Sequence, residues 1–97
     1  MNERKSVLIT GSNRGLGKEL ALVFANNNYD VILHGRDKKE LKKVKEQVSK
    51  TGVNCSSVSG DLNSNKTIDE LDKISRDKNI SVLINNAGML CPYLPLN

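Results

Sequence analysis

Three glycines with phosphate-binding spacing follow the first apolar run of this 97-residue chain. Gly11, Gly15 and Gly17 come directly after the Val-Leu-Ile run at 7–9, and an apolar pattern with helical period begins behind them. A strand, a glycine turn and a helix start together present backbone N–H groups at the positive end of a helix dipole, which attracts phosphate. Glycine suits the turn because positive φ can be required and because a Cβ would hold a pyrophosphate off the backbone. The stretch predicts a phosphate loop, with an ordinary glycine-rich turn as the alternative.

The spacing of the same residues excludes a P-loop. That motif, Gly-x-x-x-x-Gly-Lys-Ser/Thr, would place Gly17 and Lys18 at its Gly-Lys pair. It would then need glycine at position 12 and a hydroxyl at position 19, where Ser12 and Glu19 stand. The hydroxyl that would hold magnesium is therefore missing.

Four apolar runs alternate with three helical patterns along the chain. The first helix begins at the glycines, the second follows Asp37 as its N-cap with Glu40 completing a capping box, and the third covers 65–78. This alternation predicts an α/β fold with a parallel sheet, and right-handed crossovers give the strand order 3-2-1-4, which is a truncated, Rossmann-type doubly wound sheet. We expect one domain over 1–88 and an extended tail over 89–97, with strands at 6–10, 31–33, 53–59 and 80–84.

Apolar spacing predicts which face each helix buries. The second helix should bury a narrow stripe beneath its lysines, and the other two should bury larger side chains. The expected buried positions are Leu16, Leu20, Val23 and Phe24 on the first helix, Leu41, Val44 and Val48 on the second, and Ile68, Leu71 and Ile74 on the third.

Four separate motifs stand at the expected carboxyl ends of the strands. They are Thr-Gly-Ser-Asn-Arg-Gly-Leu-Gly at 10–17, Gly-Arg at 35–36, Asp-Leu at 61–62 and Asn-Asn-Ala-Gly at 85–88. In these residues and in this order, spanning nearly the whole chain, the sequence resembles the short-chain dehydrogenase/reductase family. The resemblance implies an oxidoreductase of carbonyl or alcohol substrates that uses a nicotinamide dinucleotide.

The resemblance also implies a role for each motif. The backbone from Gly11 through Ser12, Asn13, Arg14 and Gly15 to Leu16 would cradle the pyrophosphate, and Gly17 would let the helix approach the sheet. Asp61 and Leu62 would hold the adenine, with a simple loop-capping role for Asp61 as the alternative. Asn86, Ala87 and Gly88 would line the ribose side, while Asn85 would pin the central strands.

The cofactor implied is NADP, with NAD the less favoured choice. An NAD site carries an acid after the second strand, but Gly35 and Arg36 stand here and Arg14 lies in the glycine loop. Two guanidinium groups suit a 2′-phosphate. The alternative is a solvated Arg36 that Asp37 neutralises. His34, the single histidine, is interpreted as a strand-end residue near the adenosine pocket without a catalytic role.

The chain departs from the family in its catalytic residues. The family transfers hydride with a serine, a Tyr-x-x-x-Lys pair and an asparagine placed after Asn-Asn-Ala-Gly. Here Tyr93 is followed by Asn97 at the fourth position, and Pro95 is incompatible with the helix that would align such a pair. No catalytic residue is therefore predicted, and the sequence indicates a cofactor-binding part whose catalytic part is missing. A non-catalytic nucleotide-binding or interaction module and an inactive fragment are the alternatives.

The composition indicates which classes of partner and which cell compartment we expect for this protein. The net charge of +4 comes from lysines at 38–50, which favour a solvated helix face over nucleic-acid binding because only three aromatic residues are present. Two distant cysteines exclude a disulfide framework and a zinc site, and no apolar run reaches the roughly 18 residues of a membrane span. We expect a cytoplasmic protein that binds neither nucleic acid nor membrane. It should self-associate through an open fourth strand or an uncovered sheet face carrying Val7, Ile9, Val82 or Ile84.

Overall fold

The structure, a computed structural model, describes residues 4–86 of the chain, so Ala87, Gly88 and the tail predicted at 89–97 lie outside the described residues. Strands and helices alternate as the sequence predicts. Their bounds are β1 Ser6–Thr10, α1 Gly15–Asn26, β2 Asp30–Gly35, α2 Lys38–Ser49, β3 Cys55–Ser59, α3 Asn65–Lys78 and β4 Val82–Asn85.

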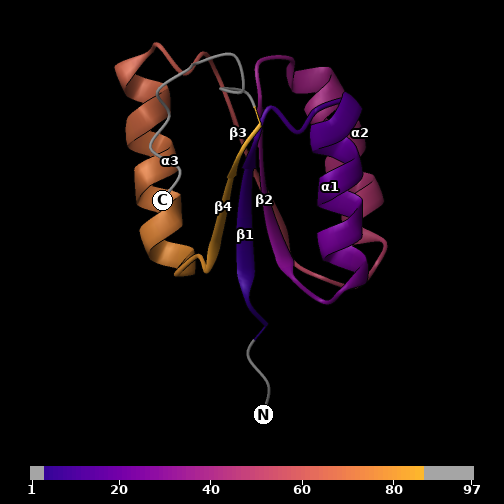
Figure 1. Ribbon diagram of the computed structural model, residues 1–97. Coiled ribbons are helices and arrows are strands. Elements are labelled where there is room, and N and C mark those ends of the chain that lie inside the picture. Colours follow the sequence, from indigo (N-terminus) through magenta and orange to yellow (C-terminus); the bar gives the residue numbers. More distant parts are fainter. Residues whose placement is uncertain (1–3, 87–97) are drawn as a thin grey trace.

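The strands form one parallel sheet in the order β3-β2-β1-β4, which confirms the predicted topology. Val7 of β1 lies opposite Val31 of β2 on one side and Val82 of β4 on the other. Helices α1 and α2 cover one face of the sheet, and α3 covers the other (Figure 1). The chain therefore crosses from one face to the other between β3 and β4, as a doubly wound fold requires.

Two apolar layers hold the sheet between the helices. Side chains alternate along each strand, so β1 sends Val7 and Ile9 toward α1 and α2 and Leu8 toward α3. All five residues of β1 are buried, as expected for a strand covered on both faces. The larger layer combines β1 and β2 with α1 and α2, and the smaller joins Leu8 and Ile32 to Val58 and Leu71.

The predicted buried face of α1 is partly wrong. Leu16 and Val23 are 59% and 54% exposed, whereas the fully buried positions of the helix are Gly17, Ala21 and Ala25. Small residues let the helix backbone lie close to the sheet, and this close approach turns the larger side chains aside. Leu20 and Phe24, also predicted, are partly buried against the core.

The other two helices follow their patterns more closely. Leu41, Val44 and Val48 are buried on α2, and the N-cap is confirmed because Asp37 Oδ1 accepts hydrogen bonds from the N–H groups of Lys39 and Glu40 at 2.9 and 3.2 Å.

On α3, Leu71 is buried and Ile74 partly so, but Ile68 is 45% exposed and Thr67 is buried in its place. Thr67 packs so tightly against Gly60 that a Cβ on that glycine would collide with its hydroxyl. This contact rotates Ile68 toward solvent.

The expectation that Val7 and Ile9 would lie uncovered is also wrong. Both are fully buried beneath α1 and α2, and Val82 and Ile84 on the same face are partly buried. The exposed apolar side chain of the sheet is Leu83, which is 60% exposed on the opposite face. Within residues 4–86, no helix is both long enough and apolar enough to cross a membrane.

Candidate functional site

The four predicted motifs meet at one end of the sheet. Parallel strands bring their carboxyl ends to the same edge, which is the upper end in Figure 1. There the loops after β1, β2 and β3, together with Asn85 and Asn86 at the end of β4, line an open groove of about 1300 Å³. Predicted site residues that line it are Gly11, Asn13, Arg14, Gly15, Arg36, Asp61, Leu62 and Asn86.

The remaining predicted residues have other positions. Ser12 is fully buried beneath the loop, Leu16 points away from the sheet, and Gly17 lies buried where α1 touches the loop. Ala87 and Gly88 lie outside the described residues.

The first half of the glycine loop is fixed to the end of β2. Ser12 donates its backbone N–H to the carbonyl oxygen of His34 at 2.7 Å, and its Oγ accepts from the N–H of His34 at 3.0 Å. Gly11 donates its N–H to Nδ1 of His34 at 3.1 Å. The N–H groups of Gly11 and Ser12 are therefore both bonded to His34. The part of the loop that can contact a ligand through its N–H groups begins at Asn13.

The second half of the loop opens α1 without a cap. Arg14, the N-cap residue, is extended with φ −166°, and no side chain caps the first turn within the described residues. That turn also contains no acidic residue. The first N–H groups of a helix have no acceptor inside it and carry the positive end of its dipole. An anion in the groove would meet these donors and the exposed side chain of Arg14.

Glycines are required at three points of this region. Gly11 and Gly15 have φ of 63° and 62°, which favours glycine. A Cβ on Gly17 would collide with the carbonyl oxygen of Gly11 and lie 2.8 Å from the side-chain nitrogen of Asn86. Asn86 holds the same carbonyl by donating Nδ2–H at 3.0 Å. Helix, loop and β4 therefore meet at one tightly packed point, and Gly17 has the packing role predicted for it.

Asn85 ties β4 to β1, because its Oδ1 accepts a hydrogen bond from Thr10 Oγ1 at 3.0 Å. This agrees with the interpretation of Asn85 as a residue that pins the central strands.

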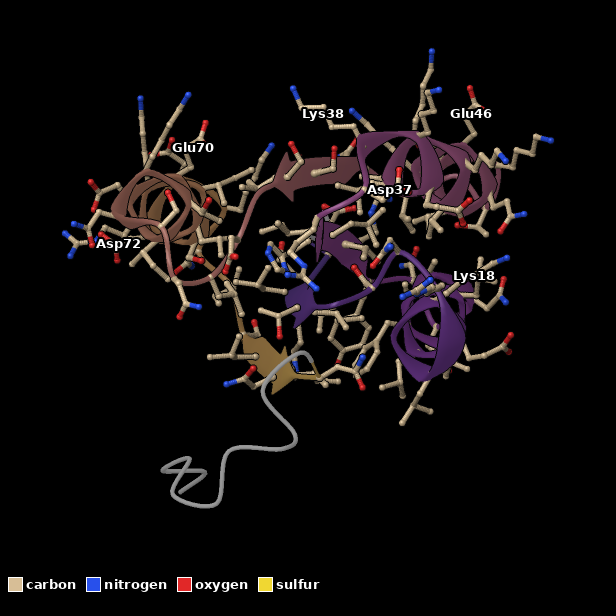
Figure 2. All side chains as sticks on the ribbon, turned by 90° about the horizontal axis from the view of Figure 1, so that it is seen from above. Lys18, Asp37, Lys38, Glu46, Glu70 and Asp72 are labelled. Atoms are coloured by element: carbon tan, nitrogen blue, oxygen red, sulfur yellow. The ribbon has the colours of Figure 1, made fainter. Side chains whose placement is uncertain are left out.

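Cationic side chains stand along the β2 side of the groove. Arg36 is exposed, and its Nη1 lies 3.9 Å from Asp61 Oδ2, a distance at which an exposed pair contributes little. Asp37 forms no ion pair with Arg36 among the described residues, and its carboxylate caps α2 instead. Lys38 lines the groove beside Arg14 and Arg36, a contribution the sequence did not reveal. Figure 2, which looks onto this end, shows Asp37 and Lys38 where α2 begins.

Gly35, the last residue of β2, cannot take a larger side chain unless the side chain of Asn13 moves. A Cβ on Gly35 would lie 2.7 Å from Oδ1 of Asn13, which packs directly over it. The strand end therefore offers guanidinium and ammonium groups, and a carboxylate at position 35 would have to displace the Asn13 side chain.

His34 has a larger role than its interpretation as a strand-end residue. It is 2% exposed and lines the groove from below. Burial lowers the pKa of His34, against the carbonyl of Gly60 and the charge of Asp61, which raise it. Its ring makes hydrogen bonds to residues 23 and 26 positions away, and a single sequence carries no signal for such contacts.

In the part of the chain that the structure describes, neither Cys55, nor a metal cluster, nor a second hollow adds chemistry to the groove. Burial raises the pKa of the Cys55 thiol to about 11, which keeps it protonated and unreactive at neutral pH. Within residues 4–86, no three or more His, Cys, Asp or Glu side chains gather as a metal site would require. A hollow of about 710 Å³ between α2 and β3 has a lysine rim away from the strand ends.

Comparisons with known proteins agree with this geometry. The family model for short chain dehydrogenases matches residues 5–95. Short-chain dehydrogenase/reductase 3 of Homo sapiens is 34% identical over 90 residues, covering 90% of this chain and 30% of that protein. The very-long-chain 3-oxoacyl-CoA reductase of Coccidioides immitis is 37% identical over 86 residues, covering 84% and 25%.

Solved structures show the same arrangement. L-Sorbose reductase from Gluconobacter frateurii, complexed with NADPH and L-sorbose, superposes with a TM-score of 0.81 at 28% identity, over 90% of this chain and 34% of that one. A short-chain dehydrogenase from Sphingobium yanoikuyae in complex with NADPH gives 0.79 at 33% identity, over 88% and 34%. This chain spans about a third of the length of such relatives.

Proposed function

The chain belongs to the short-chain dehydrogenase family, and from this premise we propose that it is the cofactor-binding part of an NADP-dependent oxidoreductase of carbonyl or alcohol substrates. Residues 1–88 form the proposed binding domain. The bound dinucleotide would supply or accept a hydride. The residues of this chain bind and orient it.

The uncapped start of α1 is the observation that carries the proposal. Its first-turn N–H groups and Arg14 face the groove, and Gly17 allows the helix to approach the loop. A pyrophosphate fits such a site because it brings negative charge and acceptor oxygens to donors that the helix itself leaves unpaired. We assign this role to the backbone from Asn13 to Leu16, with Gly11 and Ser12 shaping the loop from beneath.

The preference for NADP over NAD rests on the cations beside β2. Arg14, Arg36 and Lys38 line the groove, and Gly35 stands at the strand end where an NAD site would carry the acid that bonds a ribose 2′-OH. A 2′-phosphate would give Arg36 a doubly charged partner in place of its distant contact with Asp61.

The other groove residues would hold the two ends of the nucleotide. Leu62 is partly buried against the core beneath α3 and would contact the adenine ring, while Asp61 would accept from its amino group. Asn86, with its side chain bonded to the Gly11 carbonyl, would shape the ribose side together with Ala87 and Gly88. We place the protein in the cytoplasm, where an unpaired thiol such as that of Cys55 persists.

NADP should bind more tightly than NAD, and Arg36→Asp should reverse the preference. The substitution replaces an attraction to the 2′-phosphate with a repulsion and offers an acceptor to a 2′-OH, changing the relative affinity by roughly 1–3 kcal/mol, or about 5- to 150-fold. Calorimetric titration with both dinucleotides measures this. Lys73→Asp, the same charge change on the exposed surface of α3, is the matched control and should leave the ratio unchanged. Equal affinity of the unmutated chain for NAD and NADP would contradict the assignment.

The 97-residue chain alone should show no reductase turnover. Neither of its tyrosines has lysine at the fourth following position, since Leu33 follows Tyr29 and Asn97 follows Tyr93, so no family-type acid is available to protonate an alkoxide. Loss of NADPH absorbance with a panel of ketones and aldehydes measures the rate, with an intact family reductase as the positive control. Turnover by the purified chain at an ordinary reductase rate would show that other residues act as the acid. A non-catalytic NADP-binding module would show binding without turnover.

A further inference from the structure

One imidazole joins the two loops that flank the groove. Nδ1 of His34 accepts a hydrogen bond from the Gly11 N–H at 3.1 Å, and Nε2 lies 2.9 Å from the carbonyl oxygen of Gly60. Gly11 begins the glycine loop, and Gly60 directly precedes Asp61 and Leu62 on the opposite side. The side chain therefore spans the groove beneath its floor, from the proposed pyrophosphate site to the proposed adenine site.

Both partners select the same form of the ring. A backbone N–H only donates, so Nδ1 must be without a proton, and a carbonyl oxygen only accepts, so Nε2 must carry one. The neutral Nε2–H tautomer satisfies both contacts. A doubly protonated ring would turn an N–H toward the N–H of Gly11 and lose that bond, leaving a donor against a donor at a site where the imidazole is 2% exposed.

The imidazole is the link between the two loops that protonation can break, because the other hydrogen bonds that tie these loops to β2 use backbone groups and the Ser12 hydroxyl. Ser12 and His34 are held by their own main-chain and hydroxyl bonds, and the Gly60 N–H donates to the Gly35 carbonyl at 3.0 Å. Each of these bonds ties one loop to β2. Among the described residues, the imidazole bonds to both loops at once, so its loss would free the Gly11 N–H while Asn86 still holds the Gly11 carbonyl and the sheet stays intact.

We propose that His34 is a positioning residue that holds the glycine loop in its ligand-binding form only while its ring is neutral, so that NADP binding weakens as the pH falls. The cofactor part of this inference rests on the proposed function. The hydrogen-bond part stands on the two contacts of the ring.

The environment of His34 determines the direction in which its pKa shifts, and therefore the pH range in which its two hydrogen bonds are present. The charged groups that line the groove around the ring are Arg14 of the glycine loop, Arg36 after β2, Asp37 and Lys38 at the start of α2, and Asp61 before α3. Asp61 favours the charged ring, but burial outweighs it and lowers the pKa of His34 below 6.5. The neutral form and its two bonds are therefore present at neutral pH, and they are lost as the pH falls through the lowered pKa.

A pH series on the unmutated chain tests the hydrogen bonds without cofactor. Imidazole ¹⁵N shifts should report the Nε2–H tautomer at pH 7.5, and the Gly11 amide should exchange slowly there. On acidification, Gly11 exchange, corrected for its intrinsic pH dependence, should accelerate with the same midpoint as the protonation of His34. A Gly11 amide that ignores this titration while the chain stays folded would overturn the positioning role.

Cofactor titration then tests the link to binding. Between pH 7.5 and one pH unit below the measured midpoint of His34, the Kd for NADP should rise about tenfold more in the unmutated chain than in His34→Asn, which keeps an acceptor near the Nδ1 position but does not titrate. The change caused by the 2′-phosphate, whose second pKa is near 6, is common to both proteins and cancels. Asp69→Asn, which removes an exposed carboxylate of α3, should behave like the unmutated chain.

The two kinds of failure are distinct. Equal pH dependence in the unmutated chain and in His34→Asn would overturn the link between His34 and cofactor binding. Coupled titration of His34 and Gly11 without NADP binding at any pH would overturn the proposed function and the claim about affinity, while the hydrogen bonds would be upheld.

Discussion

Gly17→Ala should lower the free energy of unfolding by about 3 kcal/mol, a large fraction of the stability of a domain of this size. The new methyl group would collide with the Gly11 carbonyl and lie 2.8 Å from both Asn86 Nδ2 and Ser12 Cα. Two of these three neighbours are backbone, so the conflict can be relieved only by moving α1 away from the loop. The gain in helix propensity, about 1 kcal/mol, does not offset this movement.

The same movement should remove cofactor binding in the protein that remains folded. The first turn of α1 and the loop before it form the proposed pyrophosphate site, and the displaced helix would no longer present its N–H groups at the loop. Thermal unfolding and NADP titration of the same samples measure both effects. Gly52→Asn is the matched control, because its φ is 99° and a Cβ there meets nothing within 4 Å. It should cost about 1 kcal/mol and leave binding unchanged. A Gly17→Ala protein as stable as the control would show that the helix contact is not tight.

The framework of the fold could be predicted from sequence because its signals are local. Short apolar runs such as those at 7–9 and 31–33 marked the strands, helical periods marked the helices, and α3 has the predicted bounds of Asn65–Lys78. The strand order then followed from the handedness of parallel crossovers. The groove could be located for the same reason, since parallel strands must end at one edge.

The faces of α1 and α3 could not be predicted because close packing reverses the usual preference. The large apolar residues Leu16, Val23 and Ile68 were expected inside, but where a helix nearly touches a loop or strand only small side chains fit. Gly17 and Thr67 occupy those contacts. Size complementarity of this kind depends on the partner surface, which a hydropathy pattern does not contain.

Polar contacts between distant segments were missed for a related reason. The interpretation of Arg36 depended on whether Asp37 would pair with it, but in the structure Asp37 caps α2 and Arg36 lies 3.9 Å from Asp61. Ser12 was grouped with the ligand-binding backbone, but its N–H and hydroxyl both bond to His34. Asp61 and Arg36, like Ser12 and His34, are more than 20 residues apart in sequence. The Asp37 cap is a local contact, and it was predicted.

The 97-residue chain should self-associate through the β4 side of the sheet. Among the residues the structure describes, β4 is hydrogen-bonded to a strand on one side only, and its Leu83 is 60% exposed on the face that α3 covers. An edge strand offers N–H and C=O groups to a second strand. Burying a pair of Leu83 side chains between two copies would contribute about 2–4 kcal/mol, and the added ladder hydrogen bonds would contribute further.

Sedimentation velocity from roughly 1 to 100 µM tests this expectation, with the melting temperature followed over the same range. The unmutated chain should sediment faster and melt at a higher temperature as its concentration rises. Leu83→Lys should shift the chain to monomer, because a lysine on an edge strand opposes pairing. Val23→Lys removes an equally exposed apolar side chain from α1, on the other face of the sheet, and should leave association unchanged. If Val23→Lys instead shifts the chain to monomer and Leu83→Lys does not, the contact between copies lies on α1. A monomer at every concentration would mean that Leu83 and the β4 edge are covered within the chain itself.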